Sequence, residues 1–567
     1  MGVKEQVTRR AMIKGATVLT GGLAVSAAIG TATKAAARND SSVFVISDSP
    51  TTVVSDKSAI VDTNSGKVRG YTHNGIYTFK GIPYAASTSG EMRFMPPGKV
   101  TPWTGVRSSL QYGFVSPQGG SMGPAGDEIA FLASWDHGVQ GEDCLRVNIW
   151  TENINDHDKR PVMVWLHGGG FQNGSSQELK SYDGENLARR GVVLVSINHR
   201  LGVLGYLDLS AYGERYERSA NVGMLDIVAA LEWVRENIAN FGGDPANVTI
   251  FGQSGGGGKV GTLMAMPAAH GLFHKGSIHS GSMLRALTTD KSRKTAAAVL
   301  QELGLNQASI GELHTMPCEK LIAASQAALQ KNSPPPGPID MRKMADRLGW
   351  GPVVDGDVLP QHPFDPVAPA ISKDVPLMVG TVLNEFTGSL DHPENELWTD
   401  DDVKKQLAPM YGEKCAEIVA LFRRIYPAIK PLDIYSRISA APIRGSAVEQ
   451  ITRKAAQGGA PSYLWWLTWQ SPLMDGRMRA PHCADLAFVF DNTDRCETQT
   501  GGGAKPRVLA AKVSQAWVNF ARSGNPNHPG LPPWPAFVAD KCQTMIFDKV
   551  CEVKENPDTE ERKIIQG

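Results

Sequence analysis

A serine flanked by glycines constrains the fold of this chain more than any other feature. Residues 252–256 read Gly-Gln-Ser-Gly-Gly and directly follow 248–251, a short, apolar, β-branched run that predicts a strand. A serine at such a strand end, with glycine two positions away on each side, is typical of a nucleophile elbow. There the chain turns sharply and exposes the hydroxyl on a strained backbone. An ordinary glycine-rich turn is the alternative, and Ser254 is the candidate nucleophile.

A second predicted strand also ends in glycines. The apolar run 162–166 is followed by His-Gly-Gly-Gly-Phe at 167–171. Backbone without side chains can direct N–H groups towards a developing oxyanion. Two such loops in one chain make acyl transfer the leading hypothesis.

The composition argues against several other classes of protein. The chain has 567 residues, 41% of them hydrophobic and 20% charged, and its 57 basic residues balance 57 acidic residues. Because a neutral chain without charge runs has no basic field, no nucleic-acid partner is expected. Cysteine and histidine show no zinc-like spacing, so neither a metal nor a cofactor is expected. The chemistry-bearing segments extend from about residue 167 to residue 482, which favours one large α/β unit.

The N-terminus indicates export. Arg9 and Arg10 precede a stretch of small, mildly apolar residues, and an A-x-A cleavage site ends at Ala37. The stretch is too short and too rich in Gly, Ala and Thr for a stable membrane span. We expect a twin-arginine signal peptide over 1–37, with a periplasmic or secreted mature protein. An uncleaved anchor or a disordered tail is the alternative, and the polar stretch 38–57 is expected to be a linker.

The order of the predicted elements indicates a mostly parallel sheet. Further β-rich runs stand at 145–150, 192–198, 375–380 and 463–469. Apolar residues at helical spacing predict a helix over 226–241, which ends at Gly-Gly-Asp-Pro directly before the elbow strand. Strand, helix and strand in this order are typical of a βαβ unit. Residues 284–350 contain helical patterns and a proline-rich loop at 333–338, which suggest an inserted cap.

A serine nucleophile needs a histidine base, and the base needs a carboxylate to orient it. After an elbow of this type the expected chain order is serine, acid, histidine. Glu385 follows the predicted strand 375–380 and is the candidate acid. Asp355 and Asp357 are its rivals, although their surroundings read as an ordinary turn with acidic capping residues.

The histidine is harder to choose from the residues alone. His482 follows a strand and a loop and is the candidate base, whereas His528 lies in a turn of Asn, Pro and Gly. His270, His274 and His279 follow the elbow too closely in sequence to return easily to its tip. The pattern by itself leaves the choice of His482 open.

Several segments resemble the type-B carboxylesterases, the family that also contains the cholinesterases. They are 79–85, 142–148, 167–171, 251–256 and, near the C-terminus, 516–520, 524–526 and 534–535. Together they cover about residues 59 to 550. The resemblance implies an α/β-hydrolase fold with helical cap insertions over 58–554, followed by a C-terminal tail at 555–567.

The resemblance also implies the roles of the site residues. Ser254 would be the nucleophile, Glu385 the acid and His482 the base. The oxyanion hole would consist of three backbone N–H groups, those of Gly169, Gly170 and Gly255. No cofactor is implied.

The chain departs from the family pattern at two positions. Gly255 stands where the family often has alanine, but its N–H remains available. Eukaryotic relatives usually pair the cysteine of the E-D-C-L motif, here Cys144, with an upstream cysteine. No cysteine precedes Cys144, and Ser116 stands at the expected partner position, so this disulfide is predicted to be absent. The sequence does not decide the pairing of the other six cysteines.

The expected activity is hydrolysis of small-molecule carboxylic esters through an acyl-enzyme. Hydrolysis of carbamates or amides by the same groups is the nearest alternative. A non-catalytic binding or adhesion protein of the same fold is a more distant one, and the oligomeric state is left open.

Overall fold

The computed structural model describes residues 50–119, 126–332, 348–386 and 388–566. The predicted signal peptide, the first part of the predicted linker and the proline-rich loop 333–338 lie outside these ranges. The chain divides into a unit of residues 1–50 and a unit of residues 51–567, and the second unit contains every element described below.

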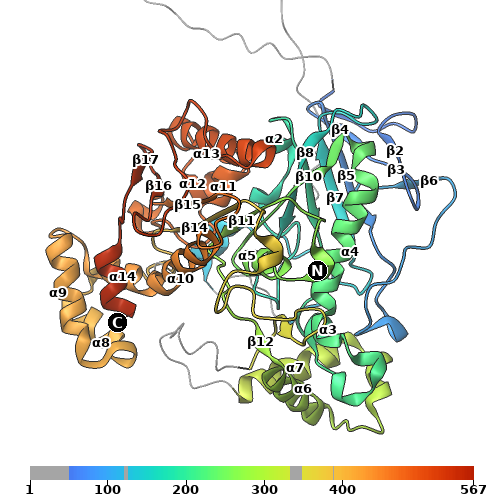
Figure 1. Cartoon of the computed structure of the whole chain (residues 1–567), viewed down its shortest axis with the longest axis horizontal. Helices are drawn as coiled ribbons and strands as arrows, with labels where there is room; N and C mark the ends of the chain where they lie inside the picture. The colour runs from blue at the N-terminus through green and yellow to red at the C-terminus, as the bar shows by residue number, and fades with distance from the viewer. Residues whose placement is uncertain (1–49, 120–125, 333–347, 387, 567) are drawn as a thin grey trace, which may run out of the picture. The chain divides into compact units, whose positions relative to one another are not determined.

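A 12-stranded sheet forms the centre of this second unit (Figure 1). In spatial order its strands are β1 (Thr52–Val53), β4 (Tyr71–His73), β5 (Ile76–Pro83), β7 (Arg146–Thr151), β9 (Val193–Ile197), β8 (Arg160–Leu166), β10 (Gly243–Gln253), β11 (Lys275–His279), β14 (Leu377–Val382), β15 (Ser462–Leu467), β16 (Thr544–Phe547) and β17 (Glu552–Lys554). All neighbours from β9 to β16 run parallel, and the strands towards both edges pair antiparallel. The predicted mostly parallel sheet is confirmed.

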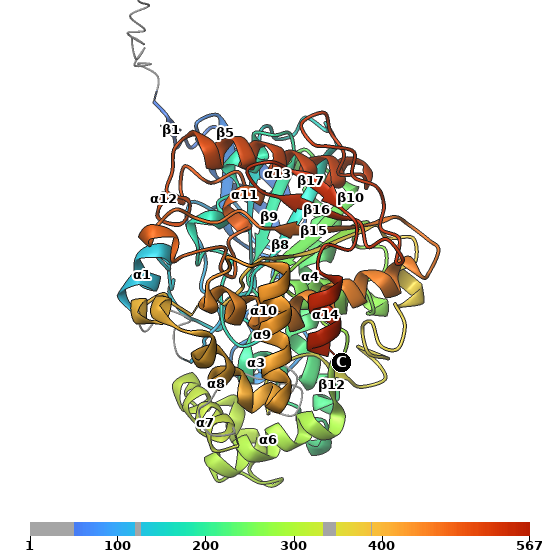
Figure 2. The same ribbon diagram turned by 90° about the vertical axis from the view of Figure 1, so that its left-hand side faces the viewer.

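Both faces of the sheet are covered by helices, which explains why its central strands are continuous apolar runs. Along β8, Val162 and Val164 face one hydrophobic core, whereas Met163 and Trp165 face the other. The first core is completed by α4 (Val222–Asn237), α5 (Gly255–Leu263) and α10 (Pro431–Ala455). The second is completed by α2 (Glu185–Ala188), α11 (Leu486–Val489) and α13 (Ala504–Ser523). Figures 1 and 2 show α11 and α13 close together beside the sheet.

Two groups of helices pack around smaller cores of their own. The first group contains α3 (Gly202–Tyr206), α6 (Thr289–Leu303) and α7 (Cys318–Lys331). The second contains α8 (Asp400–Tyr411), α9 (Cys415–Ile425), part of α10 and α14 (Thr559–Gln566). The helices predicted over 284–350 are therefore present as α6 and α7, and their role as a cap stays a prediction.

The remaining elements are short. A three-stranded sheet is formed by β2 (Ile60–Thr63), β3 (Gly66–Arg69) and β6 (Val106–Ser108), and β12 (Leu287–Thr288) pairs with β13 (Val353–Val354). The short helices α1 (Asp127–Ala133) and α12 (Glu497–Thr500) contact each other.

The folded unit extends beyond the predicted limits of 58 and 554. At its start, β1 lies inside the predicted linker and pairs with β4, because backbone hydrogen bonds do not require an apolar sequence. At its end, the predicted tail contains α14, which buries Ile565 against the helices around α9. Asp558, just before α14, forms a buried ion pair with Arg444 at 3.0 Å.

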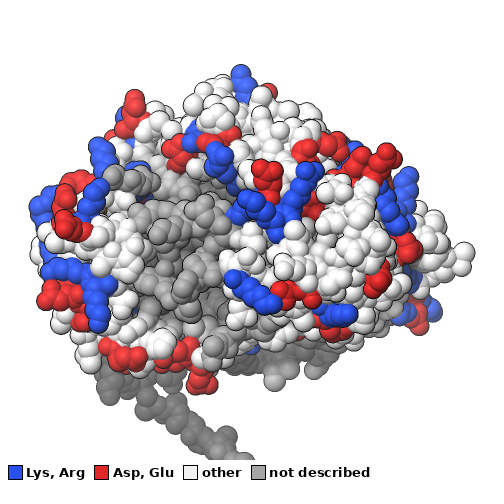
Figure 3. All heavy atoms as spheres, turned by 90° about the horizontal axis from the view of Figure 1, so that it is seen from below, with Lys and Arg blue, Asp and Glu red and all other residues white. Residues whose placement is uncertain are grey.

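On one face of the molecule, the charged side chains are dispersed. Figure 3 shows Lys and Arg interspersed with Asp and Glu on one face, without a field of a single sign. Within the described ranges, no helix combines the length and apolarity needed to cross a bilayer. The expectation of no nucleic-acid partner stays a prediction.

Candidate active site

Ser254 lies between the end of β10 and the start of α5, as the elbow pattern predicts. Its backbone has φ 56° and ψ −126°, a strained conformation for a residue with a side chain. The glycines around it are required by close backbone packing, since a Cβ on Gly256 would overlap the Leu166 carbonyl oxygen. The strained strand-to-helix turn is confirmed.

The loop 167–171 follows β8, the parallel neighbour of β10, and lies against the elbow. A Cβ built on Gly168 would stand 3.5 Å from the Ser254 Cβ, and one on Gly255 would overlap the backbone of Gly170. Gly169 and Gly170 have φ of 77° and 66°, in the region that favours glycine. Within the described ranges, the N–H groups of Gly169, Gly170 and Gly255 have no recorded intramolecular acceptor, so they are available to a ligand.

Glu385 and His482 are brought together beyond the carboxyl end of β14. Glu385 follows β14 by three residues, and its Oε2 lies 2.5 Å from His482 Nδ1. Its other oxygen accepts hydrogen bonds from Ser280 Oγ at 2.7 Å and from the Val382 N–H at 3.2 Å. The carboxylate is buried, and the His482 N–H also donates to the Glu385 carbonyl oxygen at 2.6 Å. These bonds fix both the carboxylate and the backbone that carries the ring.

The surroundings of His482 favour the tautomer that a general base needs. Burial alone lowers the pKa of the ring, but the charge and hydrogen bond of Glu385 outweigh it, so the pKa of His482 is raised above its ordinary value. The Gln253 side-chain nitrogen lies 3.0 Å from Nε2, and the Gln253 oxygen accepts from Cys483 Sγ at 3.1 Å. With Nδ1–H donating to Glu385, Nε2 is the acceptor for the Gln253 amide.

Gln253 occupies the Nε2 lone pair of the ring, and among the described residues Ser254 Oγ makes no hydrogen bond to His482. The His482 ring is 24% exposed, and the Phe386 ring stacks on it at 5.6 Å between centroids.

The rival acids lie elsewhere. Asp355 Oδ1 accepts from the N–H groups of Asp357 and Leu359, which is the capped turn predicted for it. Asp357 forms an exposed ion pair with Arg218 at 2.7 Å. Neither carboxylate contacts a candidate base.

The rival histidines also have other partners. His528 Nε2 donates to the Lys512 carbonyl oxygen at 2.9 Å. His274 Nδ1 accepts from the Val248 N–H at 3.0 Å, and His270 is exposed in a turn. His279 is buried, and its ring binds Asp485 rather than Glu385.

Three residues of the site were not anticipated from the sequence, namely Gln253, Lys259 and Ser280. Ser280 directly follows β11, so its position after a strand adjacent to the elbow strand was a usable signal. Lys259 stands alone among glycines and apolar residues of α5, and a single charge in such a helix was a second signal. The contact of Gln253 with His482 left no signal, because it joins residues 229 positions apart.

All seven cysteines are free. Ser116, at the predicted partner position, lies next to Cys144, and burial raises the pKa of that thiol to about 12. In the described part of the chain, no group of three His, Cys, Asp or Glu side chains is arranged to hold a metal ion.

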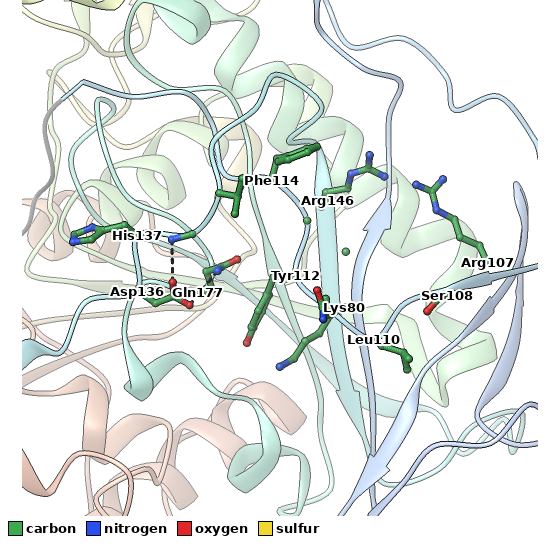
Figure 4. Close-up of a pocket in the computed structure, with 15 residues that line it drawn as sticks. Lys80, Arg107, Ser108, Leu110, Tyr112, Phe114, Asp136, His137, Arg146 and Gln177 are labelled. Carbon is green, nitrogen blue, oxygen red and sulfur yellow. Dashed lines mark hydrogen bonds between the residues drawn. The ribbon is translucent and has the colours of Figure 1, made fainter. Parts of the chain in front are cut away.

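Two cavities differ in their relation to this site. An open cavity of about 930 Å³ is lined by Lys80, Arg146, Tyr112, Phe114 and Asp136 among others, and none of the candidate catalytic residues contributes to it (Figure 4). The Lys80 ammonium lies 4.1 Å from the Tyr112 ring centre.

A smaller cavity of about 110 Å³ includes His482 and is lined mainly by apolar side chains, among them Leu132 and Met478. The smaller one provides an apolar surface beside the candidate base.

The fold and this site together define an α/β-hydrolase enzyme of the esterase type, and comparison with known proteins agrees. The carboxylesterase family matches residues 57–565, so the chain belongs to that family. It is therefore a carboxylic-ester hydrolase.

Three similar proteins illustrate the relationship. The para-nitrobenzyl esterase of Bacillus subtilis is 35% identical over 517 residues, covering 89% of this chain and 98% of the relative. The phenmedipham hydrolase of Pseudarthrobacter oxydans is 32% identical, covering 87% and 96%. A solved Clostridium hathewayi esterase, described as able to hydrolyse aliphatic aromatic polyesters, has 38% identity and a TM-score of 0.79, covering 91% of this chain and 99% of its own.

Proposed function

We propose that this enzyme hydrolyses small-molecule carboxylic esters through Ser254, His482 and Glu385, with an oxyanion hole formed by the N–H groups of Gly169, Gly170 and Gly255. The observation that carries the proposal is the bond of 2.5 Å between Glu385 and His482 at the sheet edge where Ser254 occupies a strained elbow. An ordinary glycine turn would not combine these features.

In the first step, Ser254 Oγ attacks the ester carbonyl carbon while His482 Nε2 takes the hydroxyl proton. For this the Gln253 amide must give up the Nε2 lone pair, which it occupies at 3.0 Å. The carbonyl oxygen becomes an oxyanion that the three N–H groups stabilise. Glu385 stabilises the imidazolium and does not itself take the proton.

Protonated His482 then gives its proton to the leaving alcohol as the carbon–oxygen bond breaks, which leaves an acyl group on Ser254. Water attacks the acyl-enzyme in the second step, and His482 again accepts and returns the proton. The products are a carboxylic acid and an alcohol, and the reaction requires no cofactor.

A fluorophosphonate probe tests the nucleophile directly. It should label Ser254 stoichiometrically, as peptide mass spectrometry would report, and abolish hydrolysis of p-nitrophenyl butyrate. Labelling at another serine, or full activity after Ser254 is labelled, would contradict the proposal. Absence of ester hydrolysis by the unlabelled protein would favour a binding protein of the same fold.

Carbamate hydrolysis by the same groups is the second candidate, because one relative is described as a phenmedipham hydrolase. A carbamate would form a carbamoyl-Ser254, which is released more slowly than an acyl group because nitrogen donates electrons to the carbonyl. Turnover of matched p-nitrophenyl ester and carbamate pairs distinguishes the two. A greater kcat/KM for the carbamate would reverse the order of the candidates.

For the N-terminus we propose twin-arginine export, supported by Arg9, Arg10 and the A-x-A site that ends at Ala37. Replacing both arginines with lysine should retain the precursor in the cytoplasm. N-terminal sequencing of exported protein should find a start near Arg38, and a start at Met1 or Gly2 would contradict cleavage.

A further inference from the structure

The α5 helix carries a buried lysine that the mechanism above does not use. Lys259 lies five residues after Ser254, and its side chain has no exposed surface. Burial lowers the pKa of its amine to about 7. A buried amine is costly unless its hydrogen bonds are made, so the identity of its partners matters.

The partners of Lys259 belong to the loop 167–171. Its Nζ donates to the His167 carbonyl oxygen at 2.9 Å and makes a longer contact of 3.5 Å with the Gly168 carbonyl oxygen. It also lies 5.7 Å from the centre of the Phe171 ring. Among the described residues no carboxylate forms an ion pair with it, and the neighbouring Glu178 binds the Tyr182 hydroxyl at 3.0 Å instead.

The Gly168 carbonyl is part of the same peptide group as the Gly169 N–H. Because a trans peptide is planar, its C=O and N–H point in opposite directions. A side chain that holds the Gly168 oxygen towards α5 therefore directs the Gly169 N–H away from α5. Donation to the carbonyl oxygen also polarises the peptide, which makes its N–H a better donor.

His167 holds the same carbonyl from another side. Its Nδ1 lies 3.0 Å from the Gly168 oxygen, and its ring stacks on His199 at 4.9 Å. Burial, together with the charge of Lys259, lowers the pKa of both histidines well below the ordinary value. The rings are therefore neutral, and Nδ1–H of His167 donates to the carbonyl oxygen.

We propose that Lys259 is a positioning residue of the oxyanion hole, which holds the carbonyl groups of His167 and Gly168 so that the Gly169 N–H is directed at the oxyanion. The inference rests on the function proposed for Ser254 and the loop. It assigns to Lys259 a contribution to the transition state and none to the binding of the ester.

The chain provides a matched control in Lys454, at the end of α10. This lysine is also buried, and it donates to the carbonyl oxygens of Ser372 and Lys373, both at 2.7 Å. Burial lowers the pKa of its amine to about 8. Lys454 thus has the same chemistry as Lys259 without a contact to the loop 167–171.

The experiment compares Lys259→Met with Lys454→Met on one activated ester, with active sites counted by fluorophosphonate titration run to completion. Per titrated site, Lys259→Met should lower kcat by about 10- to 100-fold with little change in KM, somewhat less than the loss of a whole oxyanion-hole donor. Lys454→Met should retain the wild-type kcat per site. The Ki of a trifluoromethyl ketone, whose hemiketal carries an oxyanion, should rise by the same factor as kcat falls.

A kcat per site for Lys259→Met equal to that of Lys454→Met would overturn the proposal. A loss of activity that appears entirely as fewer titratable sites would also overturn it, and so would an unchanged Ki for the ketone. If Lys259→Met yields too little folded protein, Lys259→Gln replaces it, because glutamine keeps an N–H donor without the charge. The kcat per site, the number of titratable sites and the Ki of the ketone then test the proposal in the same way. Failure of the proposed function would appear in the wild type as missing Ser254 labelling. Failure of this inference would appear only in the ratio of the variant's kcat per site to that of the wild type.

Discussion

Of the histidine–carboxylate pairs in the described part of the chain, His482–Glu385 and His279–Asp485 both lie near the elbow strand, but they differ in how exposed their rings are. In the first, His482 Nδ1 meets Glu385 at 2.5 Å. In the second, His279 Nδ1 meets Asp485 at 2.7 Å, and its Nε2 lies 2.9 Å from Ser277 Oγ. Among the described residues, the second pair thus also includes a serine hydroxyl bonded to its histidine, and the first does not.

The difference lies in what surrounds each pair. The ring of His279 is completely buried, and Trp517 Nε1 donates to its Nε2 at 3.0 Å. Ser277 lies within the regular strand β11, whereas Ser254 lies at the strained turn beside the loop 167–171. A substrate can reach His482, which is 24% exposed, but it cannot reach His279.

The comparison teaches that a chain of serine, histidine and carboxylate is not sufficient for hydrolysis. The nucleophile must also be accessible, and donors must stand where the oxyanion forms. A hydrogen-bonded network that is closed to solvent, such as that of His279, instead contributes to the stability of the fold.

The largest expected effect separates the two serines. Ser254→Ala should lower kcat by about 10⁴-fold or more, as loss of a serine nucleophile does in other hydrolases. Ser277→Ala removes a buried hydroxyl and should cost about 1 kcal/mol of stability with activity retained. Turnover of p-nitrophenyl butyrate and the melting temperature measure both effects. An inactive but fully folded Ser277→Ala protein would show that the buried network acts in catalysis.

Replacing the carboxylates of the two pairs, Glu385 and Asp485, should give an almost equally large difference in kcat. Glu385→Gln should lower kcat by about 10⁴-fold, because glutamine can present its amide N–H to the ring and favour the wrong tautomer. Asp485→Asn should lower the free energy of unfolding by about 3 kcal/mol, since it disrupts a buried network, and should leave the activity of the folded fraction largely intact.

Asp355→Asn and Asp357→Asn serve as controls for the choice of acid, and both should be close to wild type in turnover. If one of them lost activity without unfolding while Glu385→Gln stayed active, the acid would have been misassigned.

An intermediate effect is expected at Gly255. A Cβ there would overlap the carbonyl group of Gly170, so Gly255→Ala should displace the loop and lower kcat by about 10- to 100-fold. Gly261→Ala, on the same helix, is the matched control, because the nearest atom to its Cβ would be a side-chain amide nitrogen, that of Gln450 at 3.1 Å, and not backbone. Equal kcat values for the two variants would mean that the loop adapts to the added methyl group.

The smallest expected effect is a shift in pH dependence. His482 must be neutral to act as a base, and Glu385 raises its pKa, so the acid limb of kcat/KM should have its midpoint above 6.5. Activity is then lost as the pH falls through that midpoint. The residual activity of Glu385→Gln should show a limb at lower pH, because the burial that lowers the pKa remains while the carboxylate charge is gone.

Glu178→Gln is the control for this profile, since burial raises the pKa of Glu178 to about 7 and a second group could titrate there. Its acid limb should coincide with that of the wild type. If Glu178→Gln shifted the midpoint of the acid limb and Glu385→Gln did not, the assignment of His482 would be contradicted.

Much of the fold and part of the site could be predicted because they depend on local patterns. The apolar run at 248–251 and the glycines at 252 and 256 predicted a strand and a strained turn, and both are present as β10 and the Ser254 elbow. The boundaries were less predictable. Because β1 is held by backbone pairing and α14 by its contact with distant helices, neither left a signal in its own composition.

What the sequence by itself determined is where the backbone must be free of side chains and where a serine must be strained, since these follow from local steric limits on φ and ψ. Only the tertiary structure decided which histidine meets which carboxylate. His482 and Glu385 are 97 positions apart, and His279 and Asp485 are 206 apart. Their pairing depends on the order of strands and on the packing of the loops that follow them, and no local pattern specifies either.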